Sequence, residues 1–152
     1  MTVTTVEARG RILDDLATAA DQLALAAASL AAAYERLDDA TADRLEDQLY
    51  RPVQKAFGRA KRTRSQFAER TGLRMRALEA PAEPSGSRTP KELVDRGVLA
   101  AGEATHVLAE LQDSMVPIDA GDPELRAGLA QVREIVGPLT GRAREITRVL
   151  GR

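Results

Sequence analysis

The sequence predicts an all-α protein folded as an antiparallel up-down-up-down four-helix bundle with long helices. Apolar residues make up 43% of the chain but aromatic residues only 3%, so Ala, Leu and Val must fill the core. Ala and Leu are strong helix formers. Apolar residues also recur at helical spacings of three and four within four long segments, which three turn-forming stretches separate. A chain of 152 residues fits a single domain, residues 1–152.

The first helix is expected over residues 3–37, where apolar or small residues form a heptad seam. Its members are Leu13, Leu16, Ala20, Leu23, Ala27, Leu30, Tyr34 and Leu37. The Ala-rich window 16–33 within it is apolar, but Asp21 and Gln22 interrupt it. The uninterrupted part is shorter than the roughly 20 residues of a membrane span. We therefore predict a buried helix face and no membrane anchor, and no signal peptide is recognisable.

The second helix is expected over residues 42–80, after the turn DDATAD at 38–43. Its apolar row comprises Leu45, Leu49, Val53, Ala56, Ala60, Phe67, Met75 and Leu78. The spacing is closer to an eleven-residue repeat than to heptads, which predicts a straighter helix. Arg64 lies in this row and is expected either to snorkel at the edge of the core or to meet a carboxylate. Pro52 is expected to kink the helix near its start.

A flexible linker, PAEPSGSRTP at residues 81–90, is followed by a third helix expected over residues 90–118. The heptad seam of that helix comprises Leu93, Gly97, Ala100, Ala104, Val107, Leu111, Ser114 and Ile118.

The fourth helix is expected over residues 123–150, with Asp122 as N-cap and Pro123 at the first helical position. Its seam comprises Leu125, Leu129, Val132, Val136, Leu139, Ala143, Ile146 and Leu150. A kink is expected at Gly137-Pro138. The four seams also fit a second architecture, in which paired helical hairpins swap between the chains of a dimer.

Two clusters of polar residues contain side chains of the kinds that bind metal ions. Glu103, His106 and Glu110 have the spacing of one E-x-x-H step, but a di-iron site in a helical bundle needs two such steps and two further Glu, and this chain has one His. The seam of the third helix also turns these three residues outward. Acidic residues around the first turn could bind Mg²⁺ or Ca²⁺, but the turn breaks the geometry that would align them. They are Glu35, Asp38, Asp39, Asp43, Glu46 and Asp47.

The sequence therefore predicts no metal site, no cofactor and no catalytic residues, and the protein is not expected to be an enzyme. Cys is absent, which excludes disulfides and thiolate catalysis. The Ala- and Arg-rich composition is typical of bacterial proteins from GC-rich genomes, and a cytoplasmic location is expected.

Positive charge is concentrated in the second helix. The net charge of the chain is -1, yet residues 51–76 carry nine basic residues and one acidic residue. Several of the basic residues follow helical steps and form one stripe beside the apolar row. The candidate interaction residues are Arg51, Lys55, Arg59, Lys61, Arg62, Arg64, Arg70, Arg74 and Arg76.

Such a stripe can be neutralised in three ways. Acids of the first helix, such as Asp14, Asp15, Asp21 and Glu35, can pair with it inside the molecule. An acidic protein, or a second copy of the chain in a homodimer, can bind it from outside. A nucleic acid or other polyanion can bind through phosphate, although a pI of 5.9 and few aromatic residues disfavour this.

The function predicted from sequence is a non-enzymatic scaffold or adaptor that acts through helix–helix association between proteins, with the basic second helix as its interaction surface. The alternative is sequence-independent binding of nucleic acid or another polyanion by the same residues. A metal- or small-molecule-binding bundle is the third hypothesis.

Overall fold

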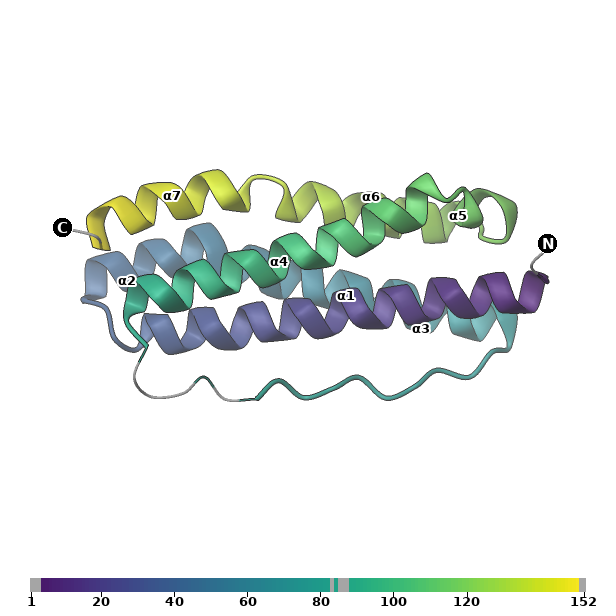
Figure 1. Ribbon diagram of the computed structural model, residues 1–152, viewed down its shortest axis with the longest axis horizontal. Helices are drawn as coiled ribbons and strands as arrows, with labels where there is room; N and C mark the ends of the chain where they lie inside the picture. Colours follow the sequence, from purple (N-terminus) through teal and green to yellow (C-terminus); the bar gives the residue numbers. More distant parts are fainter. Residues whose placement is uncertain (1–3, 83, 85–87, 151–152) are drawn as a thin grey trace.

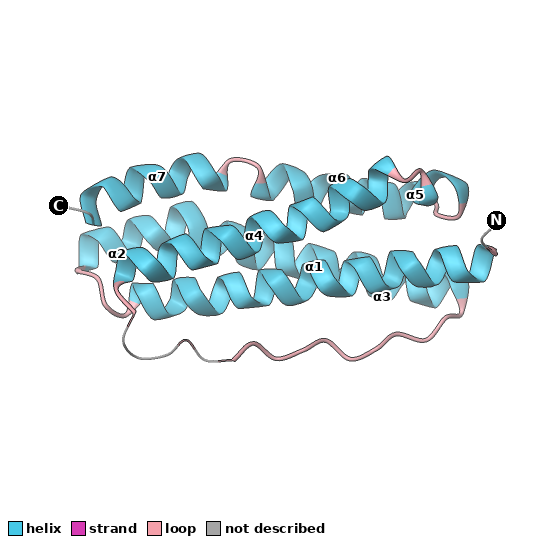
Figure 2. Ribbon diagram, in the orientation of Figure 1, coloured by secondary structure: helices cyan, strands magenta, loops and turns pink. Residues whose placement is uncertain are grey.

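The computed structural model describes residues 4–82, 84 and 88–150, and every regular element within them is helical (Figure 2). The all-α class predicted from sequence is therefore confirmed. In chain order the elements are α1 (Thr5–Tyr34), α2 (Asp39–Leu45), the π-helix η1 (Glu46–Tyr50), α3 (Arg51–Thr71), α4 (Pro90–Asp113), α5 (Val116–Asp119), α6 (Pro123–Val136) and α7 (Leu139–Leu150).

The helices begin where short polar side chains satisfy their first N–H groups. Thr4 caps α1 in a capping box with Glu7, and Asp38 caps α2. Thr89 caps α4 and Asp122 caps α6, each followed by a proline at the first helical position. Of these residues, Asp122 was predicted as an N-cap, and the fourth helix begins at Pro123 as expected.

The core is built mainly from Leu, Val and Ala. α1 packs against both α4 and α3, α3 packs against α6, and α4 packs against α6 and α7. The expected seams are largely buried, and that of the fourth helix is buried from Leu125 to Ile146. Tyr34 is an exception, because α1 ends there and 39% of its surface is exposed.

The connection between the second and third helices differs from the expected up-down-up-down order. The segment between α3 and α4, here called the crossover segment, returns along the length of the molecule (Figure 1). α4 therefore runs in the same direction as α3 and opposite to α1 (Figure 1). The up-down-up-down prediction is wrong because it assumed that every connection joins two neighbouring helix ends.

Gly72 is the physical reason for this difference. Its φ of 71° and ψ of 16° lie in the left-handed region, which glycine adopts without a Cβ clash, and this ends α3 at Thr71. The N–H of Leu73 donates to the carbonyl of Ala68 across this cap, 3.1 Å away. The second helix was expected to continue to residue 80, so Met75 and Leu78 lie on the crossover segment instead of on the helix.

Contacts with α1 show the path of the crossover segment. Arg76 pairs with Asp21 at 2.9 Å, and the backbone N–H of Glu79 donates to the same carboxylate. Further on, Arg36 donates to the carbonyl of Arg88. The described parts of the segment thus contact α1 near its middle and the chain just after its end. The predicted linker 81–90 covers part of this segment, and residues 83 and 85–87 of it lie outside the described residues.

The third helix ends earlier than residue 118. α4 stops at Asp113, and Met115 has a left-handed backbone with φ 68°, after which the short α5 begins. Within α4 the buried row contains Leu108, while Val107 is only half-buried. Ile118, expected on the seam, is 56% exposed because the chain has already turned into α5.

Prolines reshape the second and fourth helices. Pro52 has no N–H to donate to Gln48, and the backbone there forms the π-helix η1, in which the N–H of Arg51 donates to the carbonyl of Glu46. The freed Gln48 carbonyl accepts a hydrogen bond from Arg142 Nη1 of α7 at 3.2 Å. Gly137-Pro138, expected to kink the fourth helix, separates α6 from α7.

α1 is long and apolar enough to cross a membrane by length and composition alone. Its most apolar window has a mean hydropathy of 1.4, and half of that window is buried in the structure. Core helices of soluble proteins have the same composition. In this structure, the packing of α1 on α3 and α4 buries that half of the apolar window.

Candidate interaction surface

The structure divides the predicted basic stripe into residues that are held by other parts of the chain and residues that face solvent. α3 presents its apolar side to α1 and α6, so stripe residues beside that side, such as Arg59 and Arg70, can reach residues at or near α6. The held residues are Arg51, Arg59, Arg64, Arg70 and Arg76.

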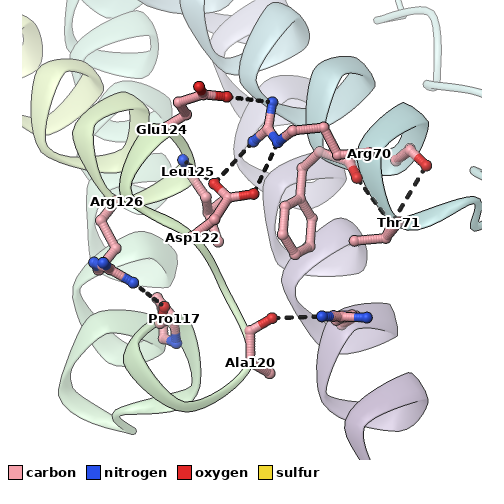
Figure 3. A network of polar contacts seen from close by, with 11 residues as sticks. Arg70, Thr71, Pro117, Ala120, Asp122, Glu124, Leu125 and Arg126 are labelled. Atoms are coloured by element: carbon pink, nitrogen blue, oxygen red, sulfur yellow. Dashed lines mark hydrogen bonds and ion pairs between the residues drawn. The ribbon is translucent and has the colours of Figure 1, made fainter.

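Arg70 is the most completely neutralised member of the stripe. Its Nε and Nη2 donate to the two carboxylate oxygens of Asp122 at 2.8 and 2.9 Å, and its Nη1 pairs with Glu124 at 3.0 Å (Figure 3). The hydrogen bond from Arg70, with that from the N–H of Leu125, holds the pKa of Asp122 below its usual value. The same contact raises the pKa of Arg70.

This contact ties the end of α3 to the start of α6. Asp122 serves both as the N-cap of α6 and as the partner of Arg70, so one carboxylate joins two elements (Figure 3). The bidentate geometry is the strongest form of an arginine–carboxylate pair. Acids of the first helix were one of the three expected ways to neutralise the stripe, and Asp21 of α1 does pair with Arg76. The acids that pair with Arg70 come instead from the start of the fourth helix.

Arg51 and Arg59 also have partners inside the molecule. The guanidinium of Arg51 lies 3.6 Å from the carboxylate of Glu46 and 4.0 Å from that of Asp47, and both acids belong to η1, immediately before α3. Arg59 donates through Nε to Gln131 of α6 at 2.5 Å. These contacts hold side chains that are partly or fully open to water, so their contribution to stability is small.

Arg64 is buried, with 5% of its surface exposed. Its Nη2 donates to the carbonyl of Arg76 on the crossover segment, and it forms no ion pair with a carboxylate of the described residues. Its Nε has no hydrogen-bond partner among the described residues. Burial lowers the pKa of Arg64, and the nearby charge of Arg76 lowers it further, while Asp21 and Asp14 oppose this.

The remaining members of the stripe are exposed, and none has an ion pair within the part of the chain that the structure describes. They are Lys55, Lys61, Arg62 and Arg74, here called the outward cations. Lys61 lies over the ring of Phe57, 4.9 Å from its centre, which leaves its charge available to solvent.

A groove of about 410 Å³ lies between α3 and the crossover segment, beside two of the outward cations. Lys61 and Arg62 form its basic rim, and Met75 and Leu78 supply apolar surface from the crossover segment. Gly58, Arg64 and Ser65 complete its lining. This groove was not predictable from the apolar spacing, which places Met75 and Leu78 on a continuous second helix, whereas α3 ends at Thr71.

Neither of the two candidate metal clusters forms a metal site in the described part of the chain. His106 and Glu110 lie 3.2 Å apart but both side chains are about two-thirds exposed. Among the described residues, no group of three His, Asp or Glu side chains is placed to hold a metal ion.

The comparisons with known proteins add no assignment: no family model, no curated protein and no solved structure matches the chain.

Proposed function

We propose that the protein is a non-enzymatic adaptor that binds an acidic segment of a partner protein through the outward cations and the groove beside them. The observation that carries this proposal is the division of the basic stripe. Arg70, Arg76 and Arg51 have carboxylate partners within the chain. The outward cations have none among the described residues, so they are the charges that an external acidic group can reach.

The groove favours a protein partner over a nucleic acid. Met75 and Leu78 give it apolar surface next to the rim formed by Lys61 and Arg62. A segment with alternating acidic and apolar side chains would use both kinds of surface. A phosphate backbone would use only the charges.

Arg64 supports an anionic occupant as well. Arg64 is a lining residue of the groove and is buried, and its Nε has no hydrogen-bond partner among the described residues. Burial disfavours the charged form of a side chain unless an opposite charge is near. A partner carboxylate bound between Lys61 and Arg62 would supply that charge.

The proposed architecture for this adaptor is a four-helix bundle with one long crossover, formed by α1, α3, α4 and the α6–α7 pair. Packing of α1 on α3 and α4, and of α3 on α6, supports it. In Figure 1, α1 runs opposite to both α3 and α4, which supports a bundle whose packed neighbours are antiparallel. A dimer of swapped hairpins remains the alternative, and sedimentation equilibrium distinguishes the two by mass.

The proposal is tested by fluorescence anisotropy with two labelled probes, an acidic peptide with leucines at helical spacing and an oligonucleotide of equal charge. We expect the peptide to bind more tightly at the same salt concentration. Exchanging Lys61 and Arg62 for Glu should weaken peptide binding about tenfold. Tighter binding of the oligonucleotide would instead support the polyanion alternative, and no binding of either probe at low salt would refute both.

Glycine substitutions provide a matched control that leaves the charges unchanged. A Cβ at Gly58 would meet no atom within 4 Å, so Gly58→Leu adds an apolar side chain to the groove lining from an unobstructed position. Gly102 on α4 has the same open surroundings and lies away from the groove. Gly58→Leu should therefore weaken peptide binding, whereas Gly102→Leu should leave it unchanged. Equal affinity of the two variants would show that the groove takes no part.

A further inference from the structure

A second cavity, of about 240 Å³, lies at the opposite end of α3 and contains both tyrosines of the chain. Its lining consists of Ala31, Tyr34, Glu35, Glu46 and Tyr50. Two aromatic rings and two carboxylates thus converge from two separate elements, α1 and η1. None of these residues belongs to the basic stripe.

The fold builds this cavity from features already described. α1 ends at Tyr34, which leaves that ring and Glu35 at the rim. The π-helix η1 places Glu46 and Tyr50 one turn apart, and the hydroxyl of Tyr50 accepts a hydrogen bond from Gln54 Nε2 at 2.9 Å. Segments of π-helix occur frequently at functional sites because they redirect side chains locally.

The electrostatics of the cavity favour a cation. Glu35 and Glu46 line it. Three further acids, Asp38, Asp39 and Asp43, lie between these two glutamates in the sequence. Within the described residues, the ion pair at these two glutamates is a weak one: Arg51 lies 3.6 Å from Glu46 and its side chain is 67% exposed. An arriving cation would therefore compete with one solvated arginine.

Apolar surface continues from this cavity into a neighbouring one. The second space has a volume of about 330 Å³ and shares Ala31 and Glu35 with the first. Its other lining residues are Ala28, Ala32, Pro81 and Pro84, which are apolar. A ligand held at Glu35 could thus extend along α1 beneath the crossover segment.

We infer that the Tyr34–Tyr50 cavity binds an organic cation, an ammonium or guanidinium group that carries an apolar substituent. Tyrosine faces attract such cations when they lie within about 6 Å of the ring centre, and the two glutamates supply opposite charge. A bare metal ion does not fit this lining, since Mg²⁺ and Ca²⁺ take six or more oxygen ligands. The cavity lies apart from the outward cations, so this inference does not depend on the proposed function.

The chain carries its own reporter for this site. It has two tyrosines and no tryptophan, so its intrinsic tyrosine fluorescence arises entirely from the cavity. We expect a saturable change in this fluorescence on titration with butyltrimethylammonium, and none with sodium at equal ionic strength. Butyltrimethylammonium should bind more tightly than tetramethylammonium, by about fourfold for each methylene that becomes buried. A change that follows ionic strength alone would overturn the inference.

Three variants test the residues that carry the argument. Glu35→Gln combined with Glu46→Gln should weaken binding about fivefold or more, while Arg51→Gln should strengthen it by removing the competitor. Asp39→Asn combined with Asp43→Asn, an equal change of charge in two residues outside the cavity lining, is the matched control. If this aspartate pair weakens binding as much as the glutamate pair does, the effect belongs to the general acidic surface and the inference is wrong. A peptide carrying one arginine is titrated in parallel with butyltrimethylammonium. Tighter binding of the peptide would indicate that the natural cation is a protein side chain, and tighter binding of the ammonium compound would indicate a free amine.

Discussion

The packing of α6 on α3 depends on the absence of a side chain at Gly128. A Cβ at this position would lie 2.2 Å from Oγ1, 2.6 Å from Cγ2 and 2.9 Å from Cβ of Thr63. Rotation of the Thr63 side chain can move the first two atoms but not its Cβ, which is fixed to the backbone. Gly128→Ala therefore requires the two helices to move apart.

The expected cost follows from two opposing terms. Alanine is more favourable than glycine in a helix by about 1 kcal/mol. Overpacking a core typically costs about 1–3 kcal/mol, and three contacts below 3.0 Å place this site at the upper end. We therefore expect Gly128→Ala to lower the free energy of unfolding by about 1–2 kcal/mol and the Tm by about 2–8 °C.

Urea unfolding followed by circular dichroism measures this change, and Gly102→Ala is the matched control. Gly102 also lies within a helix, but a Cβ there meets nothing within 4 Å, so alanine should stabilise by about 0.5–1 kcal/mol. Thr63→Ala should partly rescue Gly128→Ala, because it removes two of the three clashing atoms. Equal stability of the two glycine variants would refute the close approach of α3 and α6.

Two further predictions concern charged groups. Asp122→Ala should destabilise by about 1–2 kcal/mol through loss of the α6 cap, and Asp122→Asn should cost less because it keeps a capping oxygen. Since Arg70 lowers the pKa of Asp122 below its ordinary 3.8, the charge contributes fully above that pH and is lost as the pH falls below it toward the folded-state value. Unfolding curves from pH 7 to 2 should thus show the wild type losing more stability than Asp122→Asn at the acid end, and parallel profiles would contradict the pairing. Arg64→Met should raise the free energy of unfolding by about 1 kcal/mol, because it replaces a buried charge that has no ion pair among the described residues; a loss of stability in the same melt would show that its hydrogen bond to the crossover segment matters more.

The helices were predictable because each one carries its own periodic signal. The row from Leu125 to Ile146 needs only the sequence of the fourth helix, and Asp122-Pro123 marks where that helix begins. The end of the second helix was missed, although a glycine that follows a basic last turn is a common stop signal. The apolar spacing of the second helix continues past Gly72 to Met75 and Leu78, so periodicity alone predicts one uninterrupted helix.

The interaction surface was only partly predictable. The basic stripe is visible in the sequence, but which of its members stay free depends on residues far along the chain. Arg70 meets Asp122, and Arg59 meets Gln131, because α6 packs beside α3. The spacing of residues within the second helix does not indicate which residues of α6 will lie beside it.

The tyrosine cavity was missed for a different reason. Tyr34 was assigned to the core seam because it continues the heptads of the first helix. The helix ends at that residue, and the π-helix at Glu46–Tyr50 changes the helical phase opposite it. Pro52 was the available signal, since a proline near a helix start leaves one carbonyl free and shifts the pattern of hydrogen bonds.

The crossover segment has a consequence for the order in which the protein can assemble during synthesis. The main packing partner of α1 is α4, which lies beyond this segment in the chain. A nascent chain that has completed α1 and α3 therefore still exposes the apolar face of α1 to water. The helical hairpin of α1 and α3, which is synthesised first, therefore has an incomplete core. The Leu- and Ala-rich face of α1 is covered only after α4 has been synthesised.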